Sequence, residues 1–135
     1  MIAIGLLLWL AGAQGVQYLP AGDVAAAMEK TPPAPMINTE HFAVMGLRRT
    51  AAGQSEIHEK DTDIFYIIDG KATFITGGKM VGGKITAPGE MRGTGIEGGQ
   101  SRILSKGDVI TIPNGTPHWY SAVDGSVTDF VVKVR

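Results

Sequence analysis

From Met36 to the end of the chain, short apolar runs rich in β-branched and aromatic residues alternate with turn-forming glycine, proline and aspartate. Eight or more runs of this kind predict an all-β fold, a small β-barrel or jelly roll, because short strands joined by tight turns build such architectures. The 19 glycines and 7 prolines of the 135 residues supply the turns. This length fits a single domain that buries a core of its own.

Composition narrows the possible sites and partners. The formal net charge is -1 and no basic stripe or polybasic run is present, so neither nucleic acid nor an anionic membrane surface is an expected partner. The chain has no cysteine, which excludes disulfides, thiolate zinc sites and cysteine nucleophiles.

The first 16 residues differ from the rest. Met1 to Leu10 is almost wholly apolar, and Ala11-Gly12-Ala13 is typical of the cleavage site of a secretory signal, although the positively charged start of such a signal is missing. The run is too short to span a bilayer as a helix. It predicts a signal peptide and export to the periplasm or the medium. The alternatives are a mis-assigned start or a buried first strand in a cytoplasmic protein.

Residues 17–35 predict a short helix followed by a proline-rich arm. Val24 to Lys30 contains good helix formers, and Pro20 and Asp23 suit the first turn. Thr31 to Pro35 then ends the helix. Residues 36–135 form the predicted barrel.

Within the barrel the expected strands are 41–49, 55–60, 63–69, 72–76, 102–104, 108–112, 118–123 and 127–134. Asp124-Gly125 predicts a hairpin between the last two. The glycine-rich segment from Gly77 to Gly99 is expected to be an irregular excursion.

Two segments carry potential metal ligands. Side chains alternate across a strand, so Glu56 and His58 share one face, and Asp63 opens the next strand after a tight reversal. His118 begins a third strand. If these faces line one barrel interior, two imidazoles and two carboxylates converge, a set that suits iron(II), manganese, zinc or nickel.

Alternation also predicts the surroundings of this site. Phe65 follows the parity of Asp63, and Tyr120 that of His118, so both are candidate pocket residues. Arg48 and Arg49 point to opposite faces of their strand; one could reach a substrate carboxylate, although a salt bridge is the commoner role.

A second prediction concerns the opposite face of the strand that starts at Asp63. Ile64, Tyr66 and Ile68 are apolar too, so this face needs a cover: the helix, the proline arm or a second subunit.

The two segments resemble the two motifs of the cupin superfamily, and the similarity extends from Met45 to Lys133. The second motif, G-x5-P-x-G-x2-H-x3-N, is matched by Gly107, Pro113, Gly115 and His118. It departs at its last position, where Ala122 stands for asparagine. The chain is most similar to small single-domain bacterial cupins.

The first motif, H-x-H-x(3,4)-E-x6-G, fits in two registers. Alignment on Gly70 puts Asp63 at the glutamate position, His58 at the second histidine and Glu56 at the first. The rival register puts His58 first and Lys60 second. Lys60 would then be a base or an anion partner in a metal-free pocket, because a protonated lysine is a poor ligand. The first register is favoured, since every ligand in it can bind metal.

The resemblance to cupins implies a divalent transition metal, a small-molecule substrate and a homodimer. It implies dioxygenase, isomerase, lyase or decarboxylase activity, with His58, His118 and one carboxylate on the metal. The alternative is a non-catalytic cupin that binds a small ligand with a structural metal or none, and a weaker one is an assembly domain. One fold hosts many chemistries, so the substrate stays open.

Overall fold

The computed structural model describes residues 15–135, so nearly all of the predicted leader lies outside the described residues. The helix α1 spans Ala21–Met28, starting three residues before the predicted Val24. Its first turn is closed by the carbonyl of Pro20, which accepts from the N–H groups of Asp23 and Val24. Within residues 15–135, no helix is long and apolar enough to cross a membrane.

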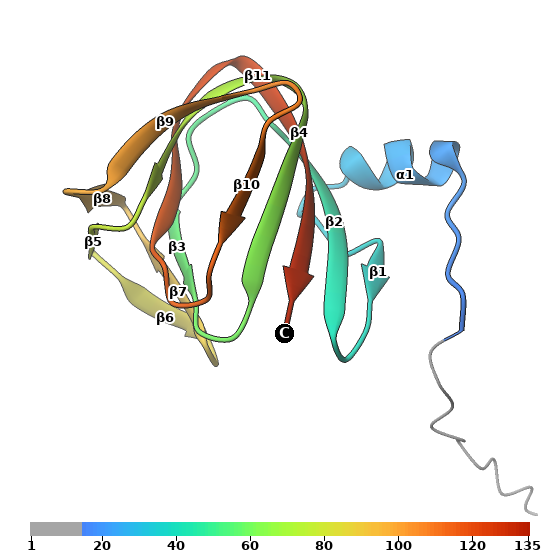
Figure 1. The fold of residues 1–135 in the computed structure, drawn as a ribbon, viewed down its shortest axis with the longest axis horizontal. Coiled ribbons are helices and arrows are strands. Elements are labelled where there is room, and N and C mark those ends of the chain that lie inside the picture. The colour runs from blue at the N-terminus through green and yellow to red at the C-terminus, as the bar shows by residue number, and fades with distance from the viewer. Residues whose placement is uncertain (1–14) are drawn as a thin grey trace, which may run out of the picture.

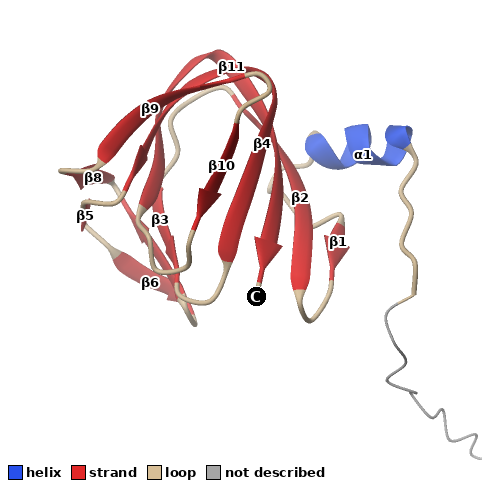
Figure 2. Ribbon diagram, viewed as in Figure 1, coloured by secondary structure: helices blue, strands red, loops and turns tan. Residues whose placement is uncertain are grey.

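Strands make up most of the rest (Figure 2). They are β1 Ile37–Asn38, β2 Phe42–Arg49, β3 Ser55–His58, β4 Thr62–Thr76, β5 Lys79–Val81, β6 Lys84–Ala87, β7 Glu90–Gly93, β8 Gly95–Glu97, β9 Gln100–Ser105, β10 Val109–Ile112 and β11 His118–Val134. Nine of them form one antiparallel sheet that curls into a barrel, while β5 and β8 pair separately (Figure 1). The all-β jelly-roll prediction is confirmed.

The two long strands, β4 and β11, pair along nearly their whole length and form a seam shared by two walls. One wall continues from the first half of β4 to β10 and from the second half of β11 to β2. The other continues from the second half of β4 to β9 and from the start of β11 to β3. Gly70 lies at the bend with a φ of 83°, where a Cβ would lie 1.9 Å from the carbonyl oxygen of Ser126. Only glycine fits there.

The predicted hairpin at Asp124-Gly125 is wrong. β11 runs through this point with a register shift between Asp124 and Val127, and the positive φ of Gly125 accommodates the bulge. The chain does not reverse, because the residues on both sides pair with the same neighbouring strand, β4. For the same reason the predicted strands 63–69 and 72–76 are one strand, and Gly70 and Lys71 lie inside β4.

The segment 77–99 is not irregular. It contains β5, β6, β7 and β8, and glycines with positive φ occupy turns between them, Gly82 and Gly89 among them. The important strand is β7, which pairs with β3 and extends the wall that carries two of the predicted ligands. These strands could not be predicted from the sequence, because each is only three or four residues long.

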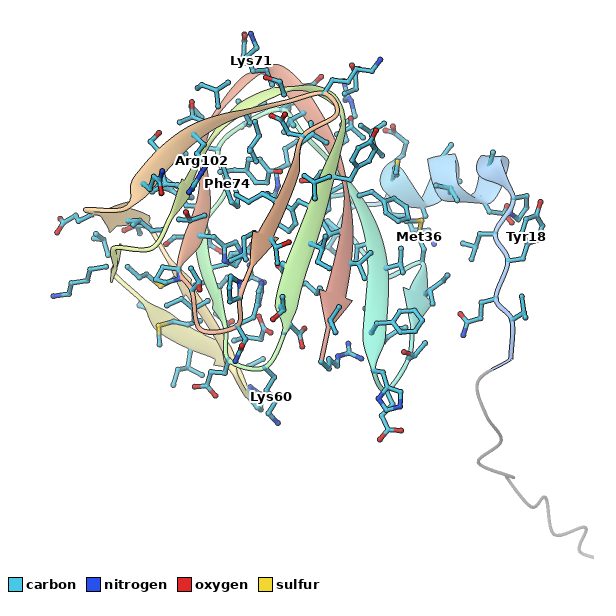
Figure 3. All side chains as sticks on the ribbon, viewed as in Figure 1. Tyr18, Met36, Lys60, Lys71, Phe74 and Arg102 are labelled. Carbon is cyan, nitrogen blue, oxygen red and sulfur yellow. The ribbon has the colours of Figure 1, made fainter. Side chains whose placement is uncertain are left out.

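Apolar side chains fill the middle of the barrel. Phe65 and Ile67 in the first half of β4 and Phe74 in its second half, where the inward parity has changed, are at most 6% exposed; Phe74 is labelled in Figure 3. The outer face of β4 is not fully covered, because Tyr66 is 49% exposed. The helix lies on β2 instead, where the absent side chain of Gly46 leaves room for Met28.

Candidate metal centre

The structure brings the four predicted ligands together at one end of the barrel interior. The Nε2 atom of His58 lies 3.4 Å from a carboxylate oxygen of Glu56 and 3.4 Å from one of Asp63. The Nε2 atom of His118 lies 3.6 Å from the same oxygen of Glu56 and 3.7 Å from that of Asp63. His58, His118 and Asp63 are at most 3% exposed, whereas the Glu56 side chain is 22% exposed. Glu56 therefore faces the opening.

Both imidazoles are oriented by their other nitrogen. Nδ1 of His58 lies 2.6 Å from a carboxylate oxygen of Glu90, and Nδ1 of His118 donates to the backbone carbonyl of Thr116 at 3.1 Å. In the neutral ring this leaves an unprotonated Nε2 that faces the site. Both Nε2 atoms are buried without a hydrogen-bond partner. When both rings are neutral, these are two buried lone pairs that face the same place, and one shared cation would satisfy both.

A divalent transition metal fits this arrangement. Ligands about 2.0–2.2 Å from one ion are roughly 3–3.6 Å apart at angles between a right angle and the tetrahedral one. Three of the four separations between imidazole and carboxylate fall within this range, and the fourth, 3.7 Å, lies just above it. One ligand atom each of Glu56, His58 and His118 lies within 4.8 Å of the other two. Two imidazoles and two carboxylates are borderline ligands that suit iron, manganese, zinc or nickel.

Each of three site residues faces a charged partner directly across a ladder. Arg92 pairs with Glu56, Glu90 with His58, and Lys133 with Asp63, all in register. Glu90, Arg92 and Lys133 were not predicted from the sequence. A signal existed for Lys133, which shares the inward parity of Val131, and none was legible for the two residues in the glycine-rich segment.

These contacts shift the pKa values of the site without a metal. Burial raises the pKa of Glu56, but the two histidines and Arg92 outweigh it and hold that pKa far below its usual range. The pKa of Asp63 is lowered, because His58 and Lys133 outweigh its burial. Burial lowers the pKa of His58, but Asp63 and Glu56 raise it to about 9. A metal would therefore displace a proton from His58.

The site opens into a cavity of about 310 Å³, enough for a small molecule. It is lined by Pro33, Met45, Leu47, Arg49, Glu56, His58, Asp63, Phe65, Arg92, Val131 and Lys133. Phe65 thus lies where the sequence placed it. The proline arm contributes Pro33 to this cavity.

Tyr120 lies deeper, on a void of about 10 Å³ behind Glu56 and His118. Its hydroxyl donates to Asp129 at 2.5 Å. Burial raises the pKa of both groups, that of Asp129 to about 6. Tyr120 is therefore a supporting residue under the cavity rather than part of its wall.

The structure places Lys60 outside the cavity. It is exposed in the turn between β3 and β4 and points away from the barrel (Figure 3). The rival register, which needs Lys60 beside His58 in the pocket, therefore lacks geometric support. The third histidine, His41, is exposed and lies outside the cavity.

A larger cavity, about 470 Å³, lies between β9 and β10. It contains none of the predicted ligands. Its charged residues are used locally, because Arg102 donates to Thr76 and Gln100 while Asp108 accepts from the N–H of Ser105. The smaller cavity, which contains predicted ligands, is therefore the candidate functional site.

Solved structures with this fold include DMSP lyase DddQ from Ruegeria pomeroyi, with a TM-score of 0.52, 20% identity and 72% of this chain covered. The chain spans 40% of the length of that lyase. An RmlC-like cupin with a double-stranded β-helix from Methanocaldococcus jannaschii gives a TM-score of 0.53 and 16% identity, covering 74% of this chain and 75% of that one. A protein from Neisseria meningitidis gives a TM-score of 0.56 at 13% identity, with 84% of this chain and 94% of that chain covered.

At these identities the solved structures establish the fold alone. No curated protein matches the chain. The sequence profile of the family described as Cupin matches residues 15–134, nearly everything outside the apolar leader. Together with the two motifs and the barrel, this shows that the chain belongs to the cupin family.

Proposed function

We propose that this protein is a metal-dependent enzyme that acts on a small molecule inside the barrel, as a dioxygenase, isomerase or lyase. The observation that carries the proposal is the pair of buried Nε2 atoms of His58 and His118, which lack hydrogen-bond partners and face the same two carboxylates. The adjoining cavity supports a substrate site. The fold shared with a DMSP lyase is compatible with such chemistry.

In this proposal His58, His118 and one or both carboxylates hold the metal. The metal supplies a Lewis acid for a substrate oxygen, or a redox centre if it is iron. Glu90 and the carbonyl of Thr116 keep both imidazoles in the ligating tautomer.

The remaining residues act on the substrate's surroundings. Whichever of the two carboxylates does not ligate is the candidate general base. Apolar residues such as Leu47, Phe65 and Val131 exclude water from the cavity.

One observation favours the alternative of a non-catalytic binding module. Arg92 and Lys133 already pair with Glu56 and Asp63, so the carboxylates are neutralised without any metal. A metal-free barrel that holds a small ligand is the second candidate function.

Metal analysis tests the choice. We expect protein purified without a histidine tag or added metal to contain a stoichiometric transition metal, and His118→Ala to lose it. Glu56→Ala is expected to weaken retention. His41→Ala and Lys60→Ala are matched controls, since both residues are exposed, and should keep the metal. Equal metal content in wild type and His118→Ala would contradict the proposal, and a metal-free wild type that stays metal-free on loading would favour the binding module.

We also propose a homodimer formed through the outer face of the wall that contains β2, β10 and the adjoining halves of β4 and β11. Tyr66, Val109 and Val134 are 49%, 64% and 42% exposed there, and Tyr66 and Val109 are cross-strand neighbours. A second copy would cover this apolar surface.

Export is proposed from the apolar leader, with a cytoplasmic location as the alternative. Cell fractionation and N-terminal sequencing of the mature protein test it.

A further inference from the structure

Arg49 is a cation of the cavity that forms no ion pair with any residue in the described part of the chain. It follows the inward parity of Met45 and Leu47 on β2 and lines the same cavity as Glu56 and His58. Its Nε atom is buried and makes no hydrogen bond. Among residues 15–135, no carboxylate forms an ion pair with it.

The guanidinium is nevertheless held in place. It lies over the ring of Tyr120, with 5.2 Å between Cζ and the ring centroid, a cation–π distance. On another side it lies against Gly53, where a Cβ would be 2.9 Å from Nη1. Gly53 is itself pinned, because its N–H donates to the carbonyl of Tyr120 and its own carbonyl accepts from the indole of Trp119. The absent side chain at Gly53 therefore makes room for the guanidinium.

Among residues 15–135, the carboxylates around the cavity form no ion pair with Arg49, although Asp129 attracts it through space. The other two cations, Arg92 and Lys133, each pair with one carboxylate of the site, Glu56 and Asp63. Asp129 is the nearby buried carboxylate, and it accepts from Tyr120 instead of pairing with Arg49. A half-buried guanidinium without a partner is costly, and a carboxylate is the group that its planar fork matches best.

We propose that Arg49 anchors the carboxylate of a small organic acid whose short apolar body lies against Met45, Leu47 and Phe65. The cavity volume of about 310 Å³ is sufficient for such an acid. The acid's far end points toward His58 and His118, and only this last statement rests on the proposed function. Arg49 is a binding and specificity residue in this assignment.

Calorimetric titration with isovalerate and its uncharged amide, isovaleramide, tests the anchor in both metal-free and zinc-loaded protein. We expect wild type to prefer the acid, and Arg49→Gln to weaken acid binding about ten- to a hundredfold while leaving the amide unchanged. Arg49→Lys keeps the charge but not the fork, so an intermediate loss is expected. Arg48→Gln is the matched control, because Arg48 is the exposed neighbour on the same strand.

Gly53→Ala provides a second route if Arg49→Gln does not fold. The added methyl displaces a flexible guanidinium end rather than backbone, so the fold should survive while acid binding weakens. Equal binding of acid and amide by wild type, or acid binding unchanged in both Arg49→Gln and Gly53→Ala, would overturn the inference.

Zinc binding measured on the same samples separates the two claims. Acid binding that depends on Arg49 in a protein that takes up no zinc supports the anchor and contradicts the metal enzyme. Normal zinc binding together with acid binding that does not depend on Arg49 supports the metal enzyme and contradicts the anchor.

Discussion

Lys133 and Asp63 lie directly opposite each other across the β4–β11 ladder, and the ammonium donates to both carboxylate oxygens at 2.8 and 3.0 Å. Asp63 is 2% exposed, so its charge is compensated by His58 and by this lysine in the absence of a metal. The barrel thus supplies a cation of its own beside the predicted metal ligands. We therefore expect stability and metal binding to be coupled through this pair.

Replacing Lys133 should expose that coupling. Lys133→Met leaves a buried carboxylate without its ammonium, and we expect the free energy of unfolding of the metal-free protein to fall by about 3 kcal/mol. Metal should restore much of the loss by binding Asp63 in the lysine's place. Urea unfolding with and without metal measures both effects. Lys71→Met, at an exposed position, is the control and should change little (Figure 3).

Glu90 should set metal affinity without touching the metal. Its carboxylate fixes the ring of His58 through Nδ1, so Glu90→Ala is expected to weaken zinc binding roughly 10–100-fold. Glu90→Gln, which can still accept from Nδ1, should lose less. Glu97→Ala removes an exposed carboxylate and serves as the control in the same chelator-competition assay. Equal affinities for the three proteins would show that His58 is oriented by other contacts.

Zinc affinity should rise with pH. The pKa of His58 is raised to about 9 in the metal-free fold from an ordinary value of 6.5, so a proton occupies the ring over that interval. Zinc displaces this proton, and apparent affinity should increase by roughly tenfold per pH unit between pH 6.5 and 8.5. Competition titrations at several pH values measure the slope. A flat profile would mean that His58 is neutral before zinc binds.

The stability of the metal-free protein should respond in the opposite direction. The protonated His58 stabilises the fold fully below its unfolded pKa of 6.5, and this contribution is lost as pH rises through about 9. Thermal unfolding of the chelator-treated protein should therefore occur at lower temperature at pH 9 than at pH 6.5. A His58→Gln variant should lose this pH dependence.

The proposed dimer can be broken at Tyr66. A charge at the centre of a buried apolar interface is strongly unfavourable, so Tyr66→Lys should convert the dimer to a monomer in light scattering after gel filtration. Ile103→Lys is the matched control, because Ile103 is 57% exposed on β9, in the other wall. A monomeric wild type, or a Tyr66→Lys variant that remains dimeric, would contradict this interface.

The local pattern predicted strands well and their continuity poorly. Glycine and aspartate at 124–125 favour a turn by residue type, yet β11 continues because β4 offers pairing partners on both sides of the bulge. Gly70 is similar, since its role depends on the backbone of Ser126, far away in sequence. Such outcomes are decided by tertiary pairing that a single-sequence pattern does not contain.

The ligands could be predicted from the sequence because motif spacing encodes them. The charged residues that pair with them could not be predicted in this way. Glu90 and Arg92 meet His58 and Glu56 only through the β3–β7 register, and β7 is four residues long within a glycine-rich segment. Lys60 was proposed from sequence spacing, but the tight reversal points it to solvent. Spacing along the chain thus identified the ligands, and strand register determined their partners.

The shared pairing of β4 and β11 has a consequence for how anything enters the barrel. Since both walls depend on these two strands, separating them would unfold the whole protein, so a metal or an acid must enter through the rim, near the arm that carries Pro33. Amide hydrogen exchange should therefore be slowest along the junction of the two strands. Local opening of the rim should set the rates at which a metal or an acid binds and dissociates.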